Sequence, residues 1–190
     1  MVEKVLLSIA KTSILQYFDE SVRIDEGALC KAHPFLSQEG ACFVTLHKNK
    51  ELRGCIGSLI AHRPLLEDIF HNAQAAAFSD PRFAPLAPNE FPFLELEVSV
   101  LTPPRFLRYE DYDDLVQKIQ PHKDGLILRY GAHQGTFLPQ VWEQLPTPKE
   151  FLEHLSYKAG TNPTIFAYHP EIYTYRVEAI EERFDAIQPL

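Results

Sequence analysis

The sequence predicts an α+β protein with a largely antiparallel sheet flanked by helices. Segments that alternate apolar and polar residues occur mostly in pairs joined by short turns, as in β-hairpins. Segments with helical spacing stand between these pairs without a regular strand–helix repeat. The chain has 190 residues, 45% of them hydrophobic and 23% charged. It is therefore long enough to bury a sizeable core without disulfides.

The N-terminal half is predicted to contain a helix, a hairpin and a second helix. Apolar residues recur every three or four positions over residues 4–18, which is typical of an amphipathic helix with a broad buried face. Residues 41–47 and 52–59 are rich in strand formers and are separated by a polar turn. Pro64 suits a first helical turn, and the helical spacing after it ends at Pro81.

The C-terminal half is predicted to add strands and two further helices. Residues 93–101 alternate as a strand with one wet or functional face, and residues 112–119 form a short acidic helix. Residues 125–138 form a second hairpin. A Thr-Pro-Lys-Glu capping box begins a helix over 147–160, and residues 172–180 close the same sheet or a second one. The two hairpin-plus-helix blocks indicate a two-lobed arrangement.

Composition excludes several classes of protein. Acidic residues outnumber basic ones by 26 to 18, for a net charge of −8, which disfavours nucleic acid as a partner. The three cysteines form no CxxC pair, and the eight histidines show no HxH or HExxH spacing, so reduced thiols and no local metal site are expected. A glutamate near the N-terminus argues against a signal peptide. No segment approaches the ~20 apolar residues needed to cross a membrane, so we expect a cytoplasmic protein.

The segment ELRGCIGS at residues 51–58 is the strongest candidate for a functional site. Gly54 and Gly57 bracket Cys55 in a predicted strand, where glycine normally weakens packing, so close approach of another group is expected. In a regular strand Arg53 and Cys55 share a face, about 7 Å apart between Cα atoms, and Leu52 and Ile56 point to the other face. A guanidinium beside a thiol favours the reactive thiolate. Cys55 is therefore a nucleophile or a ligand-contact residue, or else a small buried residue of a packed hairpin.

Two other segments offer paired polar residues. Asp80 and Arg82 lie in a turn fixed by proline, where they border a cleft or form only a local salt bridge. Glu95 and Glu97 share one face of their strand. They can act as paired carboxylates for acid–base work, or they mark a solvated sheet face.

Single residues complete the set of candidates. His47 ends the strand paired with the motif, where it either reaches Cys55 or is an exposed strand end. Gln140 is a candidate polar residue directed inward. No cofactor is indicated. The predicted catalytic residues are Cys55, Arg53, His47 and Glu97, and the predicted substrate-binding residues are Gly54, Gly57, Asp80, Arg82 and Gln140.

Four separated stretches together resemble the AMMECR-type domain family. They are LRGCIG at 52–57, AAAFSDPRF at 75–83, LEVSVL at 96–101 and GTFLPQVW at 135–142, in that order. The resemblance covers nearly the whole chain. It implies a single AMMECR-type domain over residues 1–190, with a larger lobe built on an antiparallel sheet beside a smaller lobe.

The resemblance also implies partners and a site. Prokaryotic members of the family are often encoded beside, or fused to, a Memo-like protein of extradiol-dioxygenase fold and a radical-SAM protein, the AmmeMemoRadiSam system. The family's signature motif falls on Arg53, Gly54, Cys55 and Gly57. Two functions follow as hypotheses: a small-molecule-binding protein or enzyme that uses a cleft around LRGCIG, or a non-catalytic protein–protein adaptor.

Overall fold

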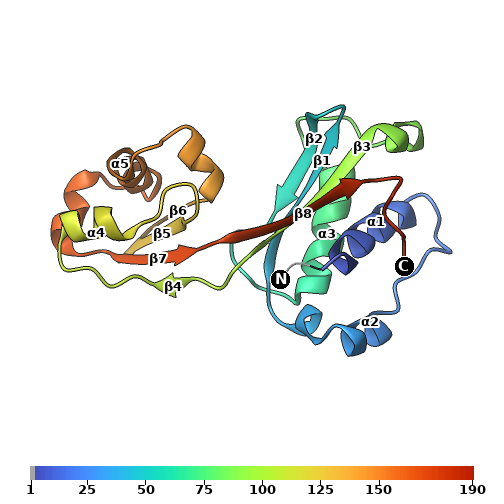
Figure 1. Ribbon diagram of the computed structural model, residues 1–190, viewed down its shortest axis with the longest axis horizontal. Coiled ribbons are helices and arrows are strands. Elements are labelled where there is room, and N and C mark those ends of the chain that lie inside the picture. The colour runs from blue at the N-terminus through green and yellow to red at the C-terminus, as the bar shows by residue number, and fades with distance from the viewer. Residues whose placement is uncertain (1–2) are drawn as a thin grey trace. The chain divides into compact units, whose positions relative to one another are not determined.

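The computed structural model describes residues 3–190, which form two compact units. Unit 1 comprises residues up to 101 together with 178–190, and unit 2 comprises residues 102–177. Each unit contains a four-stranded sheet with antiparallel pairing, packed against helices (Figure 1). The α+β prediction is confirmed.

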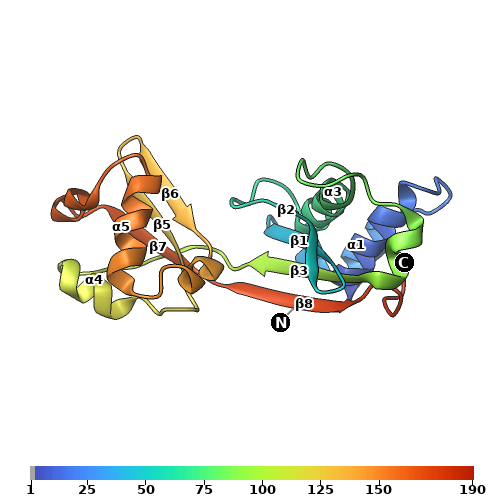
Figure 2. The ribbon, with the colours of Figure 1, turned by 90° about the horizontal axis from the view of Figure 1, so that it is seen from above.

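The sheet of unit 1 has the strand order β2-β1-β3-β8. Figure 2 shows α1 and α3 on the same side of this sheet, where they pack on each other and on its strands. We call the opposite side of the sheet the open face, because neither α1 nor α3 covers it. The elements of unit 1 are α1 (Val5–Gln16), α2 (Glu26–Ala32), η1 (Pro34–Ser37), β1 (Ala41–Lys48), β2 (Glu51–Gly57), α3 (Leu65–Phe78), η2 (Pro88–Phe93), β3 (Leu94–Leu101) and β8 (Val177–Arg183).

Alternation along β1 separates the core of unit 1 from the open face. Val44 and Leu46 are completely buried against the helices, whereas Phe43, Thr45 and His47 are half-buried. Because successive side chains of a strand point to opposite faces, these three residues lie on the open face. Residues directly opposite them in β2 and β3 share that face.

The segment after β8 is fixed by polar residues of α1. The Lys11 Nζ donates hydrogen bonds to the carbonyls of Phe184 and Ile187, both at 2.7 Å. The Thr12 hydroxyl accepts the N–H of Leu190 at 2.9 Å. Burial lowers the pKa of Lys11, and the charge of Asp185 acts in the opposite direction. The buried face of α1 is therefore partly polar.

The sheet of unit 2 has the strand order β4-β7-β5-β6. Trp142 is fully buried in its core, stacks on Phe151 with 3.8 Å between ring centroids, and donates its N–H to the Asp124 carbonyl at 2.7 Å. The predicted cap of α5 is present, since the Thr147 side chain accepts the N–H of Glu150. The elements of unit 2 are β4 (Arg105–Phe106), α4 (Tyr112–Lys118), β5 (Gly125–Tyr130), β6 (His133–Phe137), η3 (Pro139–Glu143), α5 (Pro148–Lys158), η4 (Pro163–Tyr168) and β7 (Glu171–Tyr175).

The structure corrects the prediction of one strand over residues 172–180. That stretch contains β7 of one sheet and β8 of the other. The ladder is interrupted at Arg176, whose carbonyl accepts the N–H of Thr102 and whose N–H donates to the Thr102 hydroxyl, both at 2.8 Å. Helix α2 was also not predicted from the sequence, although the side chain of its N-cap residue, Asp25, accepts the N–H of Ala28.

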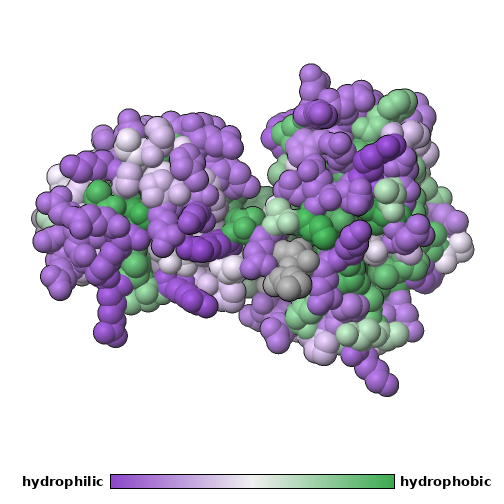
Figure 3. All heavy atoms as spheres, viewed as in Figure 1, coloured by the Kyte–Doolittle hydropathy of each residue, from purple (hydrophilic) through white to green (hydrophobic). Residues whose placement is uncertain are grey.

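Hydrophilic residues cover much of the visible surface of each unit, with groups of hydrophobic residues between them (Figure 3). Among residues 3–190, none of the helices combines the length and apolar character required to cross a bilayer.

Candidate functional site

The motif strand β2 lies at an edge of its sheet and contains a β-bulge. Cys55 is opposite Thr45 of β1, but Leu52 is opposite His47, so Arg53 is the inserted residue. A bulge changes the alternation of side chains, and Leu52 therefore lies on the open face together with Cys55. The prediction of a regular strand with Leu52 on the other face is wrong for this reason.

The guanidinium of Arg53 binds Glu90 of η2. Its Nε donates to Oε1 and its Nη2 to Oε2, both at 3.0 Å, and Nη2 also donates to the Ala84 carbonyl. Lys48 adds a contact of 2.9 Å to the same carboxylate. The side chains of Arg53 and Glu90 are only 13% and 14% exposed. Among residues 3–190, the Arg53 guanidinium donates to Glu90 and Ala84 and not to the Cys55 thiol. The expected pair of Arg53 with the Cys55 thiol is therefore not formed.

The ion pair between Arg53 and Glu90 is expected to stabilise unit 1 at neutral pH and to lose this effect in acid. The Arg53 hydrogen bonds, followed by the Ala87 N–H and Lys48, lower the pKa of Glu90 from 4.5 to about 2 despite burial. A carboxyl whose folded pKa lies below its unfolded pKa stabilises the fold above the unfolded value, and this stabilisation is lost as the pH falls towards the folded value. We expect Glu90→Gln to lower the free energy of unfolding at neutral pH by about 2 kcal/mol.

Urea denaturation between neutral pH and about pH 3 measures this effect. The difference between wild type and Glu90→Gln should shrink as the pH falls. Glu51→Gln is the matched control, because Glu51 is exposed on β2, and its stability should follow that of the wild type. A Glu90→Gln protein as stable as wild type at neutral pH would contradict the prediction.

Asp80 and Arg82 bind the backbone of Cys55 at the free edge of β2. The Asp80 Oδ2 accepts the Cys55 N–H at 2.9 Å, and the Arg82 Nη2 donates to the Cys55 carbonyl at 3.2 Å. The Arg82 hydrogen bonds, including one of 2.7 Å, hold the pKa of the Asp80 carboxyl well below its usual range. The turn thus satisfies backbone groups that a neighbouring strand would otherwise bind. Asp80 is 4% exposed and positions the motif rather than lining a surface.

The two glycines of the motif are explained by packing within unit 1. A Cβ atom on Gly54 would lie 2.2 Å from the carbonyl oxygen of Ala76 in α3. A Cβ atom on Gly57 would lie 2.3 Å from the ring of Phe43, which crosses it on the open face. The close approach expected from the sequence is therefore made by α3 and by an aromatic ring.

A row of polar side chains crosses the open face beside the motif. The Thr45 hydroxyl donates to the Cys55 Sγ at 3.3 Å, and Thr45 is also directly opposite Glu97 of β3. Ser99 donates to the Glu97 Oε1 at 2.6 Å. Neighbouring strands are about 5 Å apart, so Cys55 and Glu97 are separated by about 10 Å. A small molecule lying over Thr45 can contact both the thiol and the carboxylate.

Two predicted residues are placed away from this row. His47 lies on the open face between Leu52 and Glu95, and its Nδ1 is 3.5 Å from a carboxylate oxygen of Glu181 in β8. Among residues 3–190, the His47 side chain makes no hydrogen bond to Cys55, so the predicted pairing of these two residues is not formed. Gln140 is exposed in η3 of unit 2, so the expectation of an inward side chain is wrong. No group of three or more His, Cys, Asp or Glu side chains within residues 3–190 is arranged to hold a metal ion.

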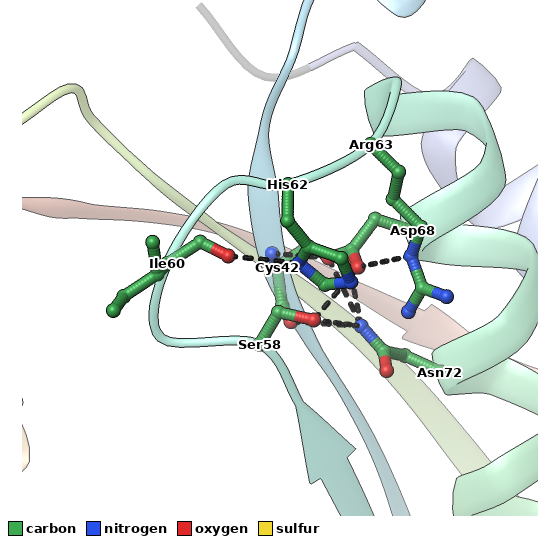
Figure 4. Close-up of polar contacts among 7 residues, drawn as sticks. All are labelled: Cys42, Ser58, Ile60, His62, Arg63, Asp68 and Asn72. Atoms are coloured by element: carbon green, nitrogen blue, oxygen red, sulfur yellow. Dashed lines mark hydrogen bonds and ion pairs between the residues drawn. The ribbon is translucent and has the colours of Figure 1, made fainter.

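A buried polar network that was not predicted from the sequence lies directly after the motif. Asp68 of α3 is completely buried and accepts hydrogen bonds from the Cys42 N–H at 2.9 Å, the Ser58 hydroxyl at 2.7 Å and the Arg63 Nε at 2.8 Å. Asn72, one turn along α3, donates to Asp68 at 3.0 Å and to the Cys42 carbonyl at 3.2 Å. Figure 4 shows these side chains converging between α3 and the chain that follows β2.

This network joins three segments of unit 1 and keeps one cysteine inert. Asp68 and Asn72 are four residues apart on the buried, otherwise apolar face of α3. Two polar residues at this spacing on a buried helix face are the sequence feature from which the network could have been predicted. Burial, followed by the charge of Asp68, raises the pKa of the Cys42 thiol well above its ordinary value. Since the thiolate is the nucleophile, Cys42 is a structural residue.

Comparison with known proteins identifies relatives along most of the chain. The family model AMMECR1 matches residues 7–180. Protein MK0488 of Methanopyrus kandleri is 37% identical over 186 residues, covering 93% of this chain and 86% of that protein. Protein MJ0810 of Methanocaldococcus jannaschii is 38% identical over 154 residues, covering 77% of this chain and 75% of that protein.

A solved structure is similar over nearly the full length. The crystal structure of protein PH0010 from Pyrococcus horikoshii superimposes with a TM-score of 0.74 at 31% sequence identity, and the match covers 98% of this chain and 96% of that one. The matches to MK0488 and to PH0010 each cover more than nine-tenths of this chain.

Proposed function

The chain belongs to the AMMECR1 family, and from this membership we propose a cytoplasmic small-molecule-binding protein or enzyme that acts with Memo-like and radical-SAM proteins. Its proposed site is the open face of unit 1 around LRGCIG. The observation that supports this site is the placement of the Cys55 thiol. It lies opposite to the face packed on α1 and α3, in a strand whose backbone is held at its edge by Asp80 and Arg82.

Each candidate residue has a distinct proposed role. Cys55 is the nucleophile, and the hydroxyl of Thr45 orients its sulfur. Glu97 orients the bound molecule or accepts a proton from it, and His47 contacts the same molecule further along β1. Arg53, bound to Glu90, is a positioning residue. Asp80 has the same role through the Cys55 backbone.

Thiol labelling tests whether Cys55 is available to a substrate. Iodoacetamide labelling of the folded protein, resolved by mass spectrometry, compares Cys55 with half-buried Cys30 and buried Cys42. We expect Cys55 to be labelled fastest and Cys42 only after unfolding. A hydroxyl donor stabilises negative charge on sulfur, so Thr45→Val should slow the labelling of Cys55 severalfold and leave the rate at Cys30 unchanged.

The same assay tests the proposed partners and can reject the site. A purified Memo-like or radical-SAM protein should protect Cys55 but not Cys30 from labelling. If Cys55 reacts as slowly as Cys42 in the folded protein, the nucleophile role is wrong. Co-purification with a partner that survives Cys55→Ala but is lost when exposed residues of the open face are changed would instead identify that face as an adaptor surface.

A further inference from the structure

Unit 2 contains a cavity of about 470 Å³ that the proposed function does not use. It is lined by β4, by β7 and by the residues that follow α4 and β7. We propose that this cavity binds a small organic phosphate, with Arg105 and Arg176 as the groups that contact the phosphate. The inference is independent of the open face in unit 1.

Arg105 provides a positive charge that is not paired with any carboxylate among residues 3–190. It lies in β4 opposite Thr174 of β7, and its side chain is exposed to the cavity. Within residues 3–190 its guanidinium has no hydrogen bond or ion pair. An arginine fork matches the geometry of a phosphate, to which it can donate two parallel hydrogen bonds.

Arg176 provides a second guanidinium that is already oriented. Its Nη2 donates to the Gln120 side chain at 3.0 Å, and its Nε is 3.5 Å from the Asp124 Oδ1. The side chain is still 54% exposed, so part of the fork remains accessible. Pre-orientation lowers the conformational entropy that a ligand must remove on binding.

The carboxylate in the cavity lining is engaged by neighbours. Asp124 is 8% exposed, accepts the backbone N–H of Gln120 at 2.9 Å and faces Arg176. Lys118 also lines the cavity, but its ammonium group is paired with Asp114 at 2.7 Å. The remaining uncompensated charge is that of Arg105, and the cavity is locally positive although the chain carries −8.

The rest of the lining suits the organic part of such a molecule. Pro103, Leu107 and Tyr175 provide apolar surface, and the hydroxyl of Thr174 adds a hydrogen-bonding group. Small-molecule sites have volumes of about 300 to 1,000 Å³ and combine apolar surface with a few placed polar groups, and the lining of this cavity is about equally polar and apolar. A free phosphate ion would leave the apolar part of this wall unused.

Binding of phenyl phosphate to the full chain tests the proposal. Titration of the ¹⁵N-labelled protein in phosphate-free buffer should give saturable shifts at the amides of Thr102, Gln120 and Asp124. The amide of Cys55 on the open face should not move. Benzoate, which carries a single negative charge on the same ring, should bind more weakly than phenyl phosphate.

Two arginine variants locate the site. Arg105→Gln should weaken phenyl phosphate binding about tenfold, as expected for loss of a charge-assisted contact. Because Arg105 is exposed and unpaired, this variant should keep the wild-type fold. Arg108→Gln is the matched control, since it removes the same charge three residues away and Arg108 does not line this cavity. Its affinity should equal that of the wild type.

Three results would overturn the proposal. They are shifts that do not saturate, shifts confined to residues outside the cavity, and equal weakening by Arg105→Gln and Arg108→Gln. Phenyl phosphate binding reports on the cavity of unit 2, and labelling at Cys55 reports on the open face of unit 1. Failure of this proposal can therefore be distinguished from failure of the proposed function.

Discussion

Replacement of Gly54 by alanine is expected to destabilise unit 1 by about 3 kcal/mol or more. The added methyl group would lie 2.2 Å from the Ala76 carbonyl oxygen and 3.1 Å from its carbonyl carbon. Both atoms belong to the backbone of α3, so no side-chain rotation can relieve the overlap. Strand β2 and helix α3 must separate, and the contacts of the motif with Asp80 and Arg82 would be strained as a result.

The buried thiol of Cys42 measures this effect directly. Cys42 is completely buried, so its labelling rate reports how often unit 1 opens. Gly54→Ala should raise that rate by at least about a hundredfold if opening is rapid. Gly27→Ala in α2 is the matched control, because a Cβ there has only an ordinary 3.6 Å contact, with the side chain of the N-cap residue Asp25. Gly27→Ala should leave the free energy of unfolding unchanged or raise it slightly. Equal labelling of Cys42 in both variants would refute the packing argument.

Removal of the Asp68 carboxylate is the second large change. Asp68→Ala leaves the Cys42 N–H, the Ser58 hydroxyl and the Arg63 guanidinium without their shared acceptor. Breaking a buried pair by removing one partner costs about 3 to 5 kcal/mol, and the unpaired backbone N–H adds to this. We expect a correspondingly lower free energy of unfolding in urea and faster labelling of Cys42.

The neighbouring residue provides the control for Asp68. Glu67→Ala removes a carboxylate from the same turn of α3, but Glu67 is exposed, so its variant should stay within about 0.5 kcal/mol of the wild type. Asp68→Asn should lie between wild type and Asp68→Ala, since an amide oxygen can keep part of the acceptor role. If Asp68→Ala unfolds at the wild-type urea concentration, the network does not stabilise unit 1.

Local patterns in the sequence were sufficient to predict most elements. The capping box at Thr147 and the apolar spacing after Pro64 are local signals, and the structure contains α5 and α3 at those places. The strand over 172–180 was misjudged because its interruption depends on Thr102, more than seventy residues earlier. Non-local hydrogen bonds of this kind leave no periodic signal along the chain.

The candidate site was harder to predict for a related reason. A bulge depends on pairing with β1, so the displacement of Arg53 towards Glu90 could not be inferred from β2 alone. The role of Asp80 as a ligand of the Cys55 backbone likewise needs the edge position of β2. The sequence did single out Cys55, Asp80 and Arg82, which meet at the motif, because glycines within a strand and clustered charges inside apolar segments are unusual. It did not single out Glu90 or Thr45, whose contacts with the motif are non-local.

The connectivity of unit 1 determines the order in which it can be completed during synthesis. Its neighbouring strands β3 and β8 are separated in the chain by all of unit 2. At about 5 to 20 residues per second, translation of unit 2 takes roughly 4 to 15 s. During that time the nascent chain carries α1, α3 and three strands, with one edge of β3 unpaired. The residues that close unit 1 are made only after all of unit 2, and until then the exposed edge of β3 is a point of vulnerability to aggregation.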